Sequence, residues 1–76
     1  MKDAEIAEVL QKESEEYRKL AEEHRRLNKD LTGLDSKRYL TPEEEVERKK
    51  IQKQKLLKKD RMAELIREYK NLIEIN

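Results

Sequence analysis

Apolar residues recur along the first half of this chain at alternating steps of four and three, and this spacing restricts the fold more than any other feature. The positions are Ile6, Leu10, Glu13, Tyr17, Leu20, His24, Leu27, Leu31 and Leu34, of which only Glu13 and His24 are polar. A sustained pattern of this kind is typical of a helix that packs lengthwise against another helix. The sequence therefore predicts a long first helix that a partner helix covers.

The composition favours long helices over a disordered segment or a sheet. Charged residues make up 49% of the 76 residues, yet the formal net charge is only +1 and the apolar residues are periodic. Such a composition with helical periodicity is typical of coiled coils, and one glycine and one proline leave few turn signals. A chain of this length predicts a single domain, residues 1–76.

The helix boundaries follow from capping signals. Thr41, Pro42 and Glu44 form a helix start, with an N-cap threonine, a proline at the first helical position and a glutamate that completes a capping box. We expect the second helix to span about 42–72, with 73–76 frayed, and the first to span about 3–36 with Gly33 inside its last turn. The link of about 37–40 is short enough to force an antiparallel, coiled-coil-like hairpin of all-α class.

Folding the chain about Tyr39 predicts the register between the two helices. The expected pairs are Leu27 with Ile51, His24 with Lys55, Leu20 with Lys58, Tyr17 with Met62, Leu10 with Tyr69 and Ile6 with Leu72. Three polar residues then lie on the seam: Glu13, His24 and Lys55. Because a seam carboxylate is costly unless it is paired, we expect Glu13 to meet Lys12, Arg61 or a cation from a second hairpin. Glu13 is then a candidate for setting the register or the oligomeric state.

The apolar surface near the open end of this hairpin is wider than one neighbouring helix covers. Its candidate interface residues are Ile6, Leu10, Leu65, Ile66, Tyr69 and Leu72. Leu56 and Leu57 also point away from the seam. Exposed apolar patches usually mark contact sites, so we expect a homo-oligomer, with a dimer forming a four-helix bundle favoured, and a protein partner as a further expectation.

A basic stretch at residues 48–61 permits two interpretations. It holds eight basic residues and one acid, and its candidate phosphate-contacting residues are Arg48, Lys49, Lys53 and Lys59. Clustered cations favour nucleic-acid binding, but these surround the whole helix instead of forming one stripe. The alternative, which we favour, is that they pair with the acidic segment 1–23 of the same chain.

No motif points to catalysis, to a cofactor or to a bound metal. The chain has a single histidine and no cysteine, so a zinc site with its usual ligands is not expected, and His24 is better interpreted as a packed seam residue. No apolar run is long enough for a membrane span, and we expect a cytoplasmic protein. The expected function is a helical protein-interaction module that self-associates through its apolar faces, with nucleic-acid association through 48–61 as the alternative.

Two segments resemble a known family. His24–Leu31 reads His-Arg-Arg-Leu-Asn-Lys-Asp-Leu and resembles the His-x-x-Leu-x-x-x-Ile/Leu segment of the YdcH-like family of small bacterial proteins of unknown function. Ile51–Met62 is similar to that family's second motif, although Lys58 stands where the family usually has an apolar residue, with Leu57 apolar instead. The resemblance implies a helical hairpin and supplies no catalytic residues.

Overall fold

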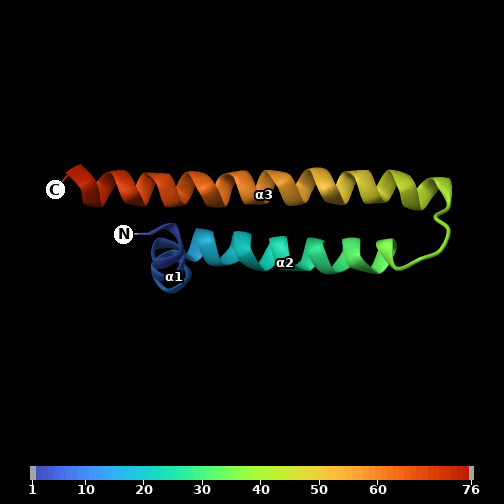
Figure 1. Ribbon diagram of the computed structural model, residues 1–76, viewed down its shortest axis with the longest axis horizontal. Helices are drawn as coiled ribbons and strands as arrows, with labels where there is room; N and C mark the ends of the chain where they lie inside the picture. Colours follow the sequence, from blue (N-terminus) through green and yellow to red (C-terminus); the bar gives the residue numbers. More distant parts are fainter. Residues whose placement is uncertain (1, 76) are drawn as a thin grey trace.

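The computed structural model describes residues 2–75, with side chains for residues 2–74, and these residues form three packed helices. They are α1 (Asp3–Glu13), α2 (Glu15–Asp35) and α3 (Pro42–Ile75). The molecule is a rod of 53 × 19 × 17 Å in which α2 and α3 run antiparallel, while α1 turns away from the rod axis (Figure 1). The all-α fold class is confirmed.

The link between α2 and α3 forms much as its sequence predicts. The Thr41 hydroxyl accepts from the backbone N–H of Glu44 at 3.1 Å, and the Glu44 carboxylate accepts from the N–H of Thr41 at 3.1 Å. This reciprocal pair is the capping box at the start of α3. Gly33 lies within α2 and its φ is not positive, as predicted for a glycine inside the last turn.

α3 is longer than predicted. It continues to Ile75, so the expected fraying of residues 73–75 is wrong, and Asn76 lies outside the described residues. Ile73 is half-buried, and this burial favours continuation of the helix.

The prediction of a single helix over residues 3–36 is wrong, because the helix is interrupted at Ser14. Ser14 has φ −105° and ψ 114°, and its hydroxyl accepts from the backbone N–H of Tyr17 at 3.1 Å. Its own N–H still donates to the carbonyl of Leu10 at 2.8 Å. Serine is a preferred N-cap residue, and Glu15 and Glu16 favour the positive end of a new helix. One residue therefore ends α1 and caps α2.

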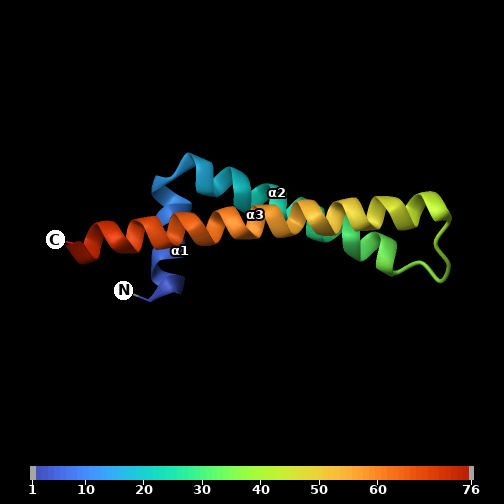
Figure 2. The same ribbon diagram turned by 90° about the horizontal axis from the view of Figure 1, so that it is seen from above.

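α1 crosses α3 and covers the wide apolar surface at the end of the rod (Figure 2). The centre of this packing is formed by Ile6, Leu10 and Tyr17, which are 0%, 7% and 6% exposed. The partly buried residues around them are Ala7, Ala21, Met62, Leu65, Ile66 and Tyr69. The wide stripe does need two neighbours, and the second neighbour is a helix of the same chain.

The predicted register is supported at three of its pairs and fails at Ile6, and one of the three, Leu10 with Tyr69, lies where α1 crosses α3 and packs in one cluster. Tyr17 packs in one cluster with Met62, and His24 faces Lys55. Leu72, the expected partner of Ile6, is 66% exposed, because α1 does not continue along α3. Near the link, Leu31 and Ile51 are each 8% exposed.

Replacing Ile6 with alanine tests whether α1 is part of the folded core. The Ile6 side chain is fully buried, so we expect Ile6→Ala to lower the free energy of unfolding by about 3 kcal/mol. Urea denaturation in dilute solution followed by circular dichroism measures this. Val46, a β-branched residue that is 54% exposed on α3, supplies the matched control, and Val46→Ala should change stability by less than about 0.5 kcal/mol. Equal losses in the two variants would mean that α1 does not pack as described.

Replacing Ser14 tests the helix break itself. We expect Ser14→Ala to cost about 1 kcal/mol, because the Tyr17 N–H loses its side-chain acceptor at the start of α2. Ser36→Ala is the control, since the Ser36 hydroxyl donates to the Gly33 carbonyl at an exposed site and caps no helix start. Thermal unfolding of both variants measures the difference, and a stability of Ser14→Ala at or above that of the wild type would contradict the capping role.

Candidate functional site

The predicted apolar interface is largely inside the folded chain. Ile6 and Leu10 are buried, so their assignment to an exposed interface is wrong, and the physical reason is that α1 packs them onto α3. The half-buried residues Leu65, Ile66 and Tyr69 pack against the same cluster. Leu72 alone among the six predicted residues is exposed, at 66%.

Glu13 does not lie on the seam, and this prediction is also wrong. The break at Ser14 makes Glu13 the last residue of α1, where its side chain is exposed. Arg61, one of the three partners expected for Glu13, binds Glu16 at the start of α2 instead. The sequence signal for this difference is Ser14 followed by two glutamates, which is a helix-start pattern.

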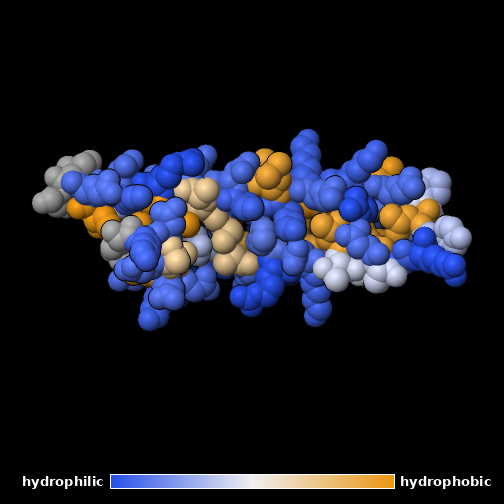
Figure 3. Space-filling view, in the orientation of Figure 1, coloured by the Kyte–Doolittle hydropathy of each residue, from blue (hydrophilic) through white to orange (hydrophobic). Residues whose placement is uncertain are grey.

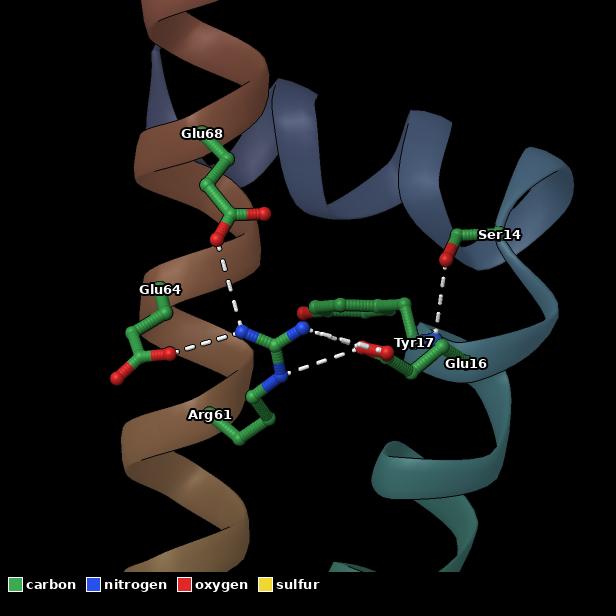
Figure 4. A network of polar contacts seen from close by, with 6 residues as sticks. All are labelled: Ser14, Glu16, Tyr17, Arg61, Glu64 and Glu68. Carbon is green, nitrogen blue, oxygen red and sulfur yellow. Dashed lines mark hydrogen bonds and ion pairs between the residues drawn. The ribbon is translucent and has the colours of Figure 1, made fainter.

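Arg61 connects α3 to the corner between α1 and α2 (Figure 4). Its Nη2 and Nε donate to Oε1 of Glu16 at 2.7 and 3.2 Å, and its Nη1 donates to Oε2 of Glu64 at 2.8 Å. Glu68 lies 3.5 Å from the same guanidinium. The hydrogen bonds to Glu64 and then to Glu16 raise the pKa of Arg61. This network holds the beginning of α2 against α3, beside the Ser14 break.

A second ion pair lies farther along the same side of the α2–α3 interface. Lys58 Nζ is 2.8 Å from Oε2 of Glu23, and the hydrogen bond from Lys58 is the main cause that lowers the pKa of Glu23. The charged head of Lys58 thus lies beside Glu23. Together with the Arg61–Glu16 pair, it supports the predicted pairing of the basic stretch with the acidic segment 1–23 at two cations, whereas Arg48 of the same stretch pairs with Asp35 outside that segment.

His24 is half-buried between α2 and α3, as predicted for a packed seam residue. Desolvation is the largest cause that lowers its pKa, followed by the positive charges of Lys55 and Lys59. Its buried Nε2 has no hydrogen-bond partner among the described residues. Lys55 is half-buried, so the seam is polar at both of these predicted positions.

The four candidate phosphate-contacting residues do not share one surface. Arg48 Nε lies 2.6 Å from Oδ1 of Asp35, which neutralises it within the chain. Lys49 and Lys53 are exposed and lie, by helical spacing, on the side of α3 opposite Ile51. Lys59 lies close to His24. A single groove-facing stripe of these cations is therefore not present on α3.

The surface of α3 that points away from α2 carries exposed apolar side chains. We define this outer face by Val46, Lys49, Lys50, Lys53, Leu56 and Leu57. Leu56 and Leu57 are 58% and 51% exposed, which confirms that they point away from the seam. Figure 3 shows hydrophobic atoms that interrupt the hydrophilic surface above the middle of α3.

The described residues show neither a metal cluster nor a membrane-spanning helix. Within residues 2–75, no three histidine, cysteine, aspartate or glutamate side chains come together as metal ligands could. No helix in this part of the chain combines the length and the apolar character needed to cross a bilayer.

Comparison of the chain with protein-family models, with curated proteins and with solved structures found no match. The resemblance to the YdcH-like family therefore stays a prediction that rests on the two segments of α2 and α3.

The environment of His24 predicts how stability depends on pH. Its pKa is lowered in the folded state from an ordinary value of 6.5, so below about pH 6.5 the unfolded chain binds more protons than the folded chain. Stability due to neutral His24 is present above this pH and is lost as the pH falls through the folded pKa. The carboxylates Glu23 and Glu44, whose pKa values are lowered from 4.5, lose their contribution only below about pH 4.5.

Urea denaturation of the wild type and of His24→Leu between about pH 7.5 and pH 5 measures this effect. We expect the wild type to lose stability across that range and His24→Leu to lose clearly less, because His24 is the one histidine of the sequence. If the free energy of unfolding fell equally with pH in the two proteins, the pH dependence would not come from His24.

Proposed function

We propose that this chain is a helical protein-interaction module that self-associates through the outer face of α3. The observation that carries the proposal is the exposure of Leu56 and Leu57 in the middle of the longest helix, with Val46 54% exposed along the same face. Full burial of a leucine side chain stabilises by about 1.5–3 kcal/mol. Because Leu56 and Leu57 are each about half exposed, covering either one in an interface would contribute roughly half of that free energy.

Charge along α3 supports a second copy of the chain as the partner. The outer face is basic before Leu57, at Lys49, Lys50 and Lys53, and acidic after it, at Asp60 and at Glu64, which also binds Arg61 of its own chain. Helical spacing places Asp60 and Glu64 on the same side as Leu57. Two antiparallel α3 helices centred on Leu57 would set the basic half of each copy against the acidic half of the other. Such a dimer brings together four long helices, α2 and α3 from each copy.

Nucleic-acid association is the weaker candidate. Arg48, Lys58 and Arg61 are engaged by Asp35, Glu23 and Glu16, so these cations of the basic stretch already have partners. The exposed lysines of the outer face are interleaved with Leu56 and Leu57. An interleaved apolar and basic face fits a helical surface of opposite charge better than a phosphate backbone.

Sedimentation equilibrium tests the proposed interface directly. We expect the wild type to dimerise and Leu56→Ser with Leu57→Ser to stay monomeric at the same concentration, with an unchanged helical circular dichroism spectrum, since both side chains are already exposed. Tyr39→Ser is the control, because Tyr39 is 83% exposed in the link and lies outside the outer face. A monomeric wild type at high concentration, or a double variant that dimerises as well as the wild type, would overturn the proposal.

A charge exchange tests the antiparallel register in the same experiment. Lys49→Glu with Lys50→Glu and Lys53→Glu makes one outer face wholly acidic, and Asp60→Lys with Glu64→Lys makes the other wholly basic. We expect each variant to be monomeric alone because like charges face each other, and an equimolar mixture to form a heterodimer. A mixture that stays monomeric while the wild type dimerises would exclude this register.

A further inference from the structure

The two sides of the α2–α3 interface differ in whether their lysine side chains form ion pairs with carboxylates. On one side a hollow is lined by Glu23, Arg26, Leu27, Gln54 and Lys58, and Lys58 is paired with Glu23. On the other side a hollow of about 320 Å³ is lined by Leu31, Gln52, Lys55, Leu56 and Lys59. Neither Lys55 nor Lys59 makes an ion pair with a described residue, so this second hollow carries uncompensated positive charge.

The groups around the second hollow add no negative charge to it. His24 on α2 faces Lys55 and Lys59 on α3, and these two lysines are the charged groups that act on it. The next carboxylate along this side of α2 is Asp35, one turn beyond Leu31, and Arg48 binds it at 2.6 Å. The hollow therefore has two cations and a polar seam residue, without a carboxylate in its lining.

The spacing of these residues fits a particular ligand chemistry. Lys55 and Lys59 are four residues apart, so they lie one helical turn apart on the same face of α3. Two ammonium groups at this spacing can contact two linked phosphate groups, and the Gln52 amide, one turn before Lys55 on the same wall, adds a neutral donor. Leu31 and Leu56 supply apolar walls against which an organic group could pack.

We propose that the hollow lined by Leu31, Gln52, Lys55, Leu56 and Lys59 binds a small diphosphate anion, either inorganic or carrying an organic group. Lys55 and Lys59 hold the two phosphates, and Gln52 donates to a phosphate oxygen. His24 is not in the lining of the hollow, but the charges of Lys55 and Lys59 act on it. This site shares Leu56 with the outer face of α3, but Lys55 and Lys59, which hold the anion, lie outside that face, so the proposal does not rest on self-association.

The position of His24 couples ligand binding to pH. A bound anion neutralises Lys55 and Lys59, so the positive charge that opposes protonation of His24 falls and the pKa of His24 rises. By linkage, the affinity for the anion increases as the pH falls through the pKa of His24 in the complex. The desolvation of His24 remains in both states, and it limits the size of this effect.

Nuclear magnetic resonance of the His24 imidazole provides the test, because the sequence contains one histidine and its signals need no assignment among others. The full chain is titrated with inorganic pyrophosphate and, separately, with adenosine 5′-diphosphate, in phosphate-free buffer at constant ionic strength. We expect the pKa of His24 to rise with either probe. Tighter binding of the nucleotide would identify an organic diphosphate as the ligand, and equal binding would identify the diphosphate group as sufficient.

A matched pair of variants separates this site from general attraction to cations. Lys55→Gln with Lys59→Gln should raise the pKa of His24 without ligand and weaken binding at least about tenfold. Lys49→Gln with Lys53→Gln removes the same charge at the same spacing from the outer face of α3, and its affinity should stay within about twofold of the wild type. Equal weakening in the two variants would overturn the proposal, since it would show diffuse electrostatic attraction.

Backbone amide shifts of the wild-type protein give a second readout that needs no variant. On addition of pyrophosphate, the largest changes should cluster at Leu31, Gln52 and Leu56, around the hollow. Changes centred on Lys49 and Lys53 instead, or the absence of any change at millimolar pyrophosphate, would overturn the assignment of the site.

Discussion

The fold depends on the width of the apolar surface near the end of α3. Leu65, Ile66 and Tyr69 form a stripe that a single antiparallel helix cannot cover, and an uncovered stripe of this width favours association or a third helix. The chain provides the third helix itself. α1 crosses the end of the rod and brings Ile6 and Leu10 onto that surface, so that the largest apolar cluster is closed within one chain.

This closure requires the chain to turn between α1 and α2, and the turn is stabilised by few groups. Ser14 supplies the N-cap that lets a new helix begin, and Arg61 holds Glu16 at the start of that helix. Exposed ion pairs contribute little individually, so the role of Arg61 is to orient the corner while apolar burial supplies the energy. With the apolar end occupied, the surfaces that we propose for binding are the outer face of α3 and the basic hollow lined by Lys55 and Lys59.

Much of α2 and α3 could be predicted from local signals, whereas the placement of α1 could not. Short-range chemistry predicts the capping box formed by Thr41 and Glu44. The short link between the helices then predicts that His24 lies opposite Lys55. The 4-3 pattern continues without a slip through Ser14, so periodicity alone indicates one helix. Whether Ser14 caps a helix or lies inside one depends on the tertiary contacts of Ile6 and Leu10, and a pattern of single residues does not contain them. The interface prediction failed for the same reason.

The turn at Ser14 is tested most directly by a distance across it. Glu5 and Lys29 are both exposed, and the sequence contains no cysteine, so Glu5→Cys with Lys29→Cys allows two spin labels to be attached without other changes. In a continuous helix their Cα atoms would be ~36 Å apart. Double electron–electron resonance, with one labelled chain diluted in unlabelled protein, should give a narrow distribution below about 30 Å because α1 turns across α3. A distribution centred near the continuous-helix distance would contradict the account.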